Sequence, residues 1–443
     1  MKENSISKDF NSKTLLLFAL PSMMMVLFES TYSVIDGLFV ANFVNKEALS
    51  SINIVFPVIL FFMGLGTMIG VGGSALVSKK IGEKRLKEAR EDFTLLGIFL
   101  IGISLIEIVV GYIFVDELIS FLGATPLLFG YAKSYFLIIL FGLPVFLSQF
   151  LFQNFFIVVG RPKLGLYSIV GAGIFHIFLD YVYIVLLDMG ISGAALASIC
   201  SSTIPAIVGI VFFSSKKVDL YFVITKWKFQ TILQSCFNGL AEMVGIMAVG
   251  VITFLFNHVM IDMIGEIGVA AITVILYAEY AFNSIFFGYA IGVVPVFAYN
   301  FGAKNHNRLK KIFKMCIVFV LGLSVFMVAC SLVLAPFIIK IFSKGDIKFY
   351  ELAFSGFVIY AIKYFFSGTN VFTAAMFTAF SNGKLAAIIS FIRSFVLVAP
   401  MIVILPKFFG LKGVWLAVPI AEAITFLLSI ILIFYARKRY KYL

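Results

Sequence analysis

The chain has 443 residues, of which 62% are hydrophobic and only 13% are charged, and its formal net charge is +12. An ordinary soluble domain carries about 25% charged residues, so this composition excludes a large aqueous domain. The apolar runs reach roughly 20 to 30 residues, a length typical of membrane-spanning helices. The basic residues fall in short loops between these runs, where they set membrane topology and do not indicate nucleic-acid binding.

Twelve apolar runs are each long enough to cross a bilayer, which takes about 20 residues of helix. In chain order they cover 14–41, 49–78, 93–115, 127–159, 164–187, 190–214, 229–261, 268–299, 312–339, 349–380, 385–406 and 410–436. Most Lys and Arg residues lie in loops on the side that holds both chain ends. The opposite side holds only Lys46, Lys340, Lys344, Lys348, Lys407 and Lys412. By the positive-inside rule, we expect both termini in the cytoplasm.

The two halves of the sequence repeat at a constant offset of 220 residues. The matched residues in the first half are Gly72, Gly82, Lys84, Gly190 and Gly193, and in the second half Gly292, Gly302, Lys304, Gly410 and Gly413. Six spans per half give both halves the same orientation. The repeat therefore predicts an all-α membrane protein of two six-helix bundles, related by a pseudo-twofold axis along the membrane normal. We expect an N-lobe at 1–214, a cytoplasmic linker at 215–228 and a C-lobe at 229–443.

A carboxylate lies inside the first apolar run, at Asp36. A charge at the centre of a membrane helix costs at least about 2.5 kcal/mol, so such residues usually mark functional sites. From the helical rise, Asp36 lies roughly 33 Å and Asp180 roughly 25 Å from the cytoplasmic start of their spans, and Ser198 about 12 Å from the external start of its own. His176 lies one turn from Asp180 on the same helix face. We expect these four residues to converge in the outer half of the first lobe.

Other ionisable residues lie within the predicted spans. Glu29 precedes Asp36 by seven residues and lies about 10 Å from it along nearly the same helix face. It can bind a cation or relay protons, or it can pair locally with Tyr or Ser. Glu242 and Glu279 lie in spans seven and eight, and Lys363 in span ten is a candidate partner for one of these glutamates.

Four stretches of the sequence together resemble the bacterial branch of the multidrug and toxic compound extrusion (MATE) family. The first span has the pattern of Tyr32, Asp36, Phe39 and Val40, the fifth span has Leu179-Asp180, and the sixth span has the motif at 193–197. The eighth span, Gly288-Tyr289-Ala290-Ile291-Gly292-Val293-Val294-Pro295, runs into Tyr299-Asn300-Phe301-Gly302-Ala303. The resemblance implies export of cationic, often aromatic compounds, driven by a proton or sodium gradient.

The resemblance also implies a cation-coupling site at Asp36, His176, Asp180 and Ser198, with sodium possible at the two aspartates. The family commonly has Asn in place of His176 and Thr in place of Ser198. Because imidazole titrates near neutrality, we predict coupling to protons over sodium. The candidate substrate-binding residues are Glu29, Tyr32, Glu242, Asn257 and Glu279.

Together, these features predict a secondary active antiporter that exports cationic or amphipathic drugs or metabolites by alternating access. We expect a monomer in the bacterial inner membrane, with small organic cations and the bilayer as partners, no nucleic acid, no cofactor and no resident metal. The alternative is a lipid-linked oligosaccharide flippase of the same superfamily, but those typically have extra spans or a basic cleft. An enzyme is not expected, because the sequence has no His-Glu-x-x-His or Asp-rich diphosphate motif, and it has no P-loop for ATP.

Overall fold

The computed structural model describes residues 5–343 and 345–443, and the predicted topology residue Lys344 lies outside them, as does the side chain of Lys46. Within the described chain, eleven helices are long and apolar enough to cross a membrane, and a bent helix pair makes twelve. The prediction of twelve spans is therefore confirmed. Apolar side chains such as Ile106, Val211 and Phe254 are more than half exposed on the outer surface, as expected for lipid-facing helices.

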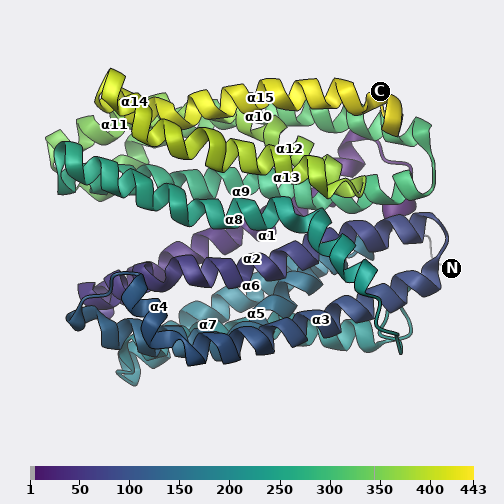
Figure 1. Ribbon diagram of the computed structural model, residues 1–443, viewed down its shortest axis with the longest axis horizontal. Helices are drawn as coiled ribbons and strands as arrows, with labels where there is room; N and C mark the ends of the chain where they lie inside the picture. Colours follow the sequence, from purple (N-terminus) through teal and green to yellow (C-terminus); the bar gives the residue numbers. More distant parts are fainter. Residues whose placement is uncertain (1–4, 344) are drawn as a thin grey trace.

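The first half forms one bundle, which Figure 1 shows in purple to blue. After a short 3-10 turn, η1 (Ser5–Ser7), its helices are α1 (Ser12–Phe43), α2 (Lys46–Gly82), α3 (Leu86–Ile113), α4 (Val115–Phe121), α5 (Pro126–Val158), α6 (Pro162–Asp180) and α7 (Gly190–Ser214). The fifth span continues from α6 through a π-helical segment, η2 (Tyr181–Leu186). The short α4 was not predicted, because seven residues are too few to give a clear periodic signal.

The second half forms the other bundle, in teal to yellow, and both chain ends lie at the same end of the molecule (Figure 1). Its helices are α8 (Phe229–Ile264), α9 (Glu266–Gly302), α10 (His306–Ser343), α11 (Ile347–Ala361), α12 (Tyr364–Ala379), α13 (Gly383–Phe391), η3 (Ile392–Val398, π-helical), α14 (Ala399–Phe409) and α15 (Leu411–Tyr440). The tenth span was predicted as one run at 349–380. It is broken between α11 and α12, which are bent by 49°.

Two equivalent glycines, each packed against the backbone of the other half, show the pseudo-twofold relation directly. A Cβ on Gly82 would lie 2.1 Å from the carbonyl oxygen of Tyr299, and a Cβ on Gly302 would lie 2.1 Å from that of Lys79. Gly82 and Gly302 are equivalent at the 220-residue offset, and so are Lys79 and Tyr299. The glycine of α2 therefore contacts α9 at the position where the glycine of α9 contacts α2, as a twofold axis requires. The approach joins the ends of α2 and α9 near the chain termini.

A methyl group at this contact should therefore weaken the structure. We expect Gly82→Ala to lower the free energy of unfolding by about 1–3 kcal/mol, because the added Cβ is forced against backbone. Thermal unfolding of the purified protein in detergent measures this effect. Gly102→Ala on α3 is the matched control, since a Cβ there has nothing within 4 Å. Equal melting of Gly82→Ala and wild type would show that this end is not closed as described.

The buried apolar side chains form two clusters that nearly follow the two halves. One cluster contains buried residues from Val40 to Leu220. The other is built mainly from residues after 240, but it also contains Ile6, Phe10, Leu15 and Ala19 from the start of the chain. The N-terminal segment and the first turns of α1 are thus packed against the second half.

The N-terminal segment is also held to the second half by polar contacts. Arg308 on α10 donates a hydrogen bond to the carbonyl of Ser7 (2.8 Å), and Lys311 pairs with Asp9 (3.0 Å). The hydrogen bond and charge of Lys311 lower the pKa of Asp9, so this carboxylate stays ionised at neutral pH. The N-terminal segment before α1 therefore packs against the opposite bundle.

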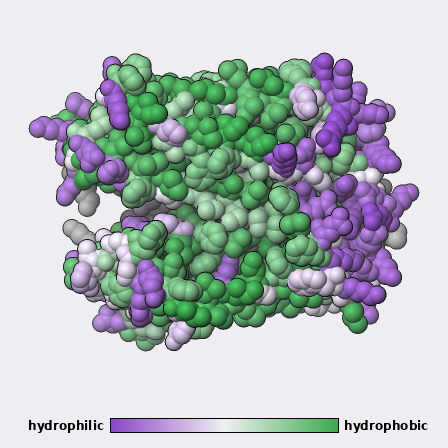
Figure 2. All heavy atoms as spheres, in the orientation of Figure 1, coloured by the Kyte–Doolittle hydropathy of each residue, from purple (hydrophilic) through white to green (hydrophobic). Residues whose placement is uncertain are grey.

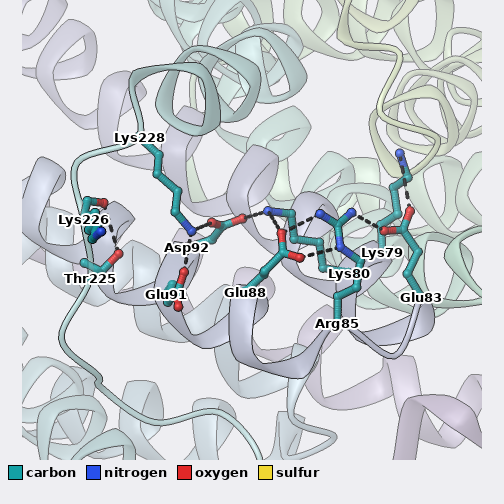
Figure 3. A network of polar contacts seen from close by, with 10 residues as sticks. All are labelled: Lys79, Lys80, Glu83, Arg85, Glu88, Glu91, Asp92, Thr225, Lys226 and Lys228. Carbon is teal, nitrogen blue, oxygen red and sulfur yellow. Dashed lines mark hydrogen bonds and ion pairs between the residues drawn. The ribbon is translucent and has the colours of Figure 1, made fainter.

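The linker before α8 crosses in the other direction, as Figure 3 shows in part. Lys228 pairs with Glu91 (2.5 Å) and approaches Asp92 (3.7 Å) on α3, and Lys80 also pairs with Asp92. The ring of Phe222 stacks on Phe93 with centroids 5.1 Å apart. Glu91 and Lys311 are equivalent positions at the 220-residue offset, so the two crossing segments use ion pairs of opposite polarity. Both segments join the bundles at the same end of the molecule.

Hydrophilic residues gather at the two ends of the molecule, with an apolar belt between them (Figure 2). The larger hydrophilic region lies at the end that holds the chain termini. At the opposite end the surface is hollowed between the two halves (Figure 2). The bundles are thus joined at one end and separated at the other, the arrangement expected of a protein that opens alternately to two sides.

Candidate functional site

Three ionisable side chains from α1 and α6 meet inside the first bundle. His176 Nε2 lies 3.4 Å from Asp36 Oδ1 and 3.2 Å from Asp180 Oδ2. The three residues each offer a ligand atom, and these atoms all lie within 4.8 Å of one another. Asp180 is fully buried and His176 almost so, whereas the Asp36 side chain is 19% exposed. The structure therefore brings together three of the four residues expected at the cation-coupling site.

A serine on α7 contacts the second ring nitrogen of His176, Nδ1. The Ser201 hydroxyl donates a hydrogen bond to the carbonyl of Ser198 (3.0 Å) and lies 3.2 Å from His176 Nδ1. A hydroxyl has one proton, and with that proton on the carbonyl of Ser198 the Ser201 oxygen is free to accept a hydrogen bond from Nδ1–H. In the neutral ring, Nε2 would then direct a lone pair at two carboxylates. A proton or another cation at Nε2 would offset the repulsion between this lone pair and the two carboxylates.

The fourth predicted residue, Ser198, contributes through its backbone carbonyl to this network, by way of Ser201. Sequence reasoning missed Ser201, although it lies three residues after Ser198 and therefore on the same helix face. Tyr32, a candidate substrate-binding residue, packs its ring against the imidazole of His176 with centroids 5.6 Å apart. An aromatic side chain thus borders the cation cluster.

The other candidate on α1, Glu29, is half-buried. Gln149 on α5 donates a hydrogen bond to its carboxylate at 3.4 Å. An amide from α5 is therefore one of the partners of Glu29.

Glu279 on α9 is engaged with its own partners in the second half. Tyr360 donates a hydrogen bond to it, and Lys363 forms an ion pair with it. The ammonium also lies over the rings of Tyr360 and Tyr364, at 5.3 and 5.6 Å from their centroids. Lys363 is 1% exposed and lies in the break between α11 and α12, so the bend turns it inward to Glu279. Lys363 is thus the internal counter-ion of Glu279.

A second charged network fills the core of the second half. Arg393 pairs with Glu422 at 2.6 Å, and Asn370 donates to the same carboxylate at 2.7 Å. Glu242 is half-buried and lines a small pocket beside Arg393 and Asn370. No sequence motif predicts this network, because its members come from four separate elements. Asn257 on α8 is half-buried, and its side-chain oxygen has no hydrogen-bond partner among the described residues.

Comparison with known proteins identifies the family. The family model described as MatE matches residues 21–182 and 229–404, well over half of the chain. This protein belongs to the MATE family. Its relatives include a "Multidrug export protein MepA" of Staphylococcus haemolyticus (strain JCSC1435), 26% identical over 96% of this chain and 94% of that protein. The protein of the same description from Staphylococcus aureus (strain MRSA252) is 24% identical, with the same coverage.

Solved MATE structures share the fold. A crystal structure of MATE in complex with MaL6 superposes with a TM-score of 0.92 at 19% identity, covering 99% of this chain and 100% of that one. An outward-facing multidrug resistance MATE transporter of the MOP superfamily gives 0.91 at 20% identity, covering 99% of both chains. The expected fold of two six-helix bundles is therefore confirmed for this MATE protein, which is a multi-pass membrane transporter.

Proposed function

We propose that this MATE transporter is a proton-coupled antiporter that exports cationic or amphipathic drugs or metabolites. The relatives described as multidrug export proteins support the export of drugs. They share about a quarter of their residues with it over nearly the whole chain. The proton is proposed on the geometry of the cluster formed by Asp36, His176 and Asp180.

The observation that carries the choice of ion is the direction of His176 Nε2. It faces both aspartates, at 3.4 and 3.2 Å, while Nδ1 is occupied by Ser201. A proton on Nε2 gives the imidazolium a hydrogen-bond donor toward both carboxylates and offsets their charge. Sodium is a hard cation that prefers oxygen ligands, and the imidazole occupies a position where an amide oxygen would serve it better.

We place both termini in the cytoplasm of a bacterial cell and the protein in its inner membrane, where it acts as a monomer. The basic loops support this orientation. The hollow between the bundles then opens outward, and the cluster lies in the outer half of the N-lobe. The N-lobe (1–214) and C-lobe (229–443) would rock about the contact of Gly82 and Gly302 to expose the cleft alternately.

We place the substrate in the cleft beside α1. Glu29 supplies a carboxylate there, and Tyr32 supplies an aromatic face for cation–π contact. Tyr32 also touches His176, so a bound substrate and a bound proton would act on neighbouring side chains. In exchange, proton arrival from outside would neutralise the cluster and weaken the hold of the cleft on a cationic substrate.

Efflux from proteoliposomes tests the function. A fluorescent organic cation is loaded, and a proton gradient or a sodium gradient is imposed separately. We expect efflux to follow the proton gradient in sodium-free buffer. Efflux that requires sodium and ignores the pH gradient would overturn the choice of ion while leaving export intact, and no efflux under either gradient would overturn export.

His176→Asn tests the coupling role of the ring. We expect the pH dependence of efflux to shift and the response to sodium to improve, because the amide restores an oxygen ligand and removes a group that titrates near neutrality. Rates are measured as a function of external pH, with and without sodium. An unchanged pH profile in a well-folded variant would exclude His176 from proton coupling.

A further inference from the structure

The same cluster has the donor set of a transition-metal site. It combines one imidazole nitrogen with two carboxylate oxygens, and such mixed nitrogen and oxygen sets bind Zn²⁺, Co²⁺ and related ions. We propose that Asp36, His176 and Asp180 bind a divalent transition-metal ion such as Zn²⁺ or Co²⁺. Metal binding itself is independent of transport, whereas its consequence for export rests on the proposed function.

The distances between the donor atoms suit such an ion. Zinc bonds to imidazole and carboxylate are about 2.0–2.2 Å long, so ligand atoms at two corners of a tetrahedron lie roughly 3.4 Å apart. The two distances from His176 Nε2, to Asp36 and to Asp180, are 3.4 and 3.2 Å. All three donor atoms lie within 4.8 Å of one another, so small side-chain rotations bring the carboxylates to the ion. Because the Asp36 side chain is partly exposed, a water molecule could reach the ion there as a fourth ligand.

Asp180 points independently to a bound cation. Its side chain is fully buried, neither carboxylate oxygen is assigned a hydrogen bond among the described residues, and its ion-pair partner is His176 Nε2 at 3.2 Å. A buried charge is normally paired or coordinates a metal, because an unpaired one loses its hydration without compensation. The imidazole of His176 is its close neighbour and can serve as a fellow ligand. A divalent ion between these groups would satisfy both carboxylates at once.

The contact with Ser201 prepares the ring for ligation. A histidine that binds a metal usually donates its other N–H to a neighbouring oxygen, which fixes the tautomer and the ring orientation. Here Nδ1 lies 3.2 Å from the Ser201 hydroxyl oxygen, which can accept from Nδ1–H while its own proton goes to the carbonyl of Ser198. The lone pair of Nε2 is thereby directed at the space between the aspartates. Ser201 is a positioning residue in this proposal.

Metal and proton would exclude each other at this cluster. The ion needs the lone pair of Nε2, so binding releases the proton that Nε2 carries, and affinity rises with pH. Under the proposed function, Zn²⁺ outside the cell would hold the cluster in its neutralised form without delivering a proton. It would therefore inhibit proton-driven efflux.

Cobalt absorption tests the site without any gradient. The full chain, purified without a histidine tag, is titrated with Co²⁺ in detergent, and the visible bands of the bound ion are followed. We expect saturation at one ion per chain, displacement by Zn²⁺ and release of protons into a weak buffer. His176→Asn should abolish the bands, and Ser201→Ala should weaken binding about 10–100-fold. Absence of binding in wild type would overturn the proposal.

A second histidine provides the matched control. His258 and Asp262 have the same four-residue spacing on α8, but both are about two thirds exposed and their charged atoms lie 3.8 Å apart. His258→Asn should leave the cobalt titration unchanged. If His258→Asn and His176→Asn lower binding equally, the ion is adventitious and the proposal fails. If cobalt binds at His176 but efflux ignores the proton gradient, the metal site stands and proton coupling alone is wrong.

Discussion

Asp36→Asn is expected to reduce gradient-driven efflux to the level of protein-free vesicles while the protein still inserts and folds. The amide has the shape of the carboxylate, but it can neither take up a proton nor balance a charge on His176. Only Asp180 would then face Nε2, so the cluster could no longer exchange a proton with the side from which Asp36 is exposed. The measurement is efflux of a fluorescent cation under an imposed proton gradient.

Asp262→Asn is the matched control for this variant. Asp262 pairs with a histidine four residues away, as Asp180 does, but its side chain is 65% exposed. It should export at the wild-type rate. Normal export by a well-expressed Asp36→Asn protein would remove the cluster from the transport cycle.

Lys363→Met is expected to destabilise the protein by about 3–5 kcal/mol, the usual effect of breaking a buried ion pair by removing one partner. Lys363 is 1% exposed, and its loss removes the cation from the Glu279 carboxylate and leaves the hydroxyl of Tyr360 as its partner among the described residues. The cation–π contacts with Tyr360 and Tyr364 disappear as well. Thermal unfolding in detergent, monitored by tryptophan fluorescence, measures the loss.

The double variant Lys363→Met with Glu279→Gln separates charge from packing. Neutralising the glutamate should restore most of the stability, because the uncompensated carboxylate is the main cost. Lys407→Met, at an exposed position on α14, should change stability by no more than about 0.5 kcal/mol. Equal melting of the single and double variants would show that the ion pair is not the source of the effect.

Much of the architecture could be predicted because it depends on local properties of the sequence. The length of each apolar run determines whether a helix can cross the bilayer, and this gave the twelve spans. The 220-residue offset of Gly82 and Gly302 indicated two equivalent bundles before their reciprocal contact was known. Depth along the spans also placed Asp36 and Asp180 at a similar level, because the rise of a helix is constant.

The number of spans, the internal repeat and the candidates of the cation cluster could therefore be predicted from the residues alone. Three contacts required the folded chain: Ser201 with the His176 ring, Lys363 with Glu279, and the N-terminal segment with α10. The break of the tenth span at Lys363 could likewise not be predicted from the sequence. These features depend on which faces of distant helices meet. Hydrophobicity drives helices together without specifying direction, and only packed side chains decide which polar groups become partners.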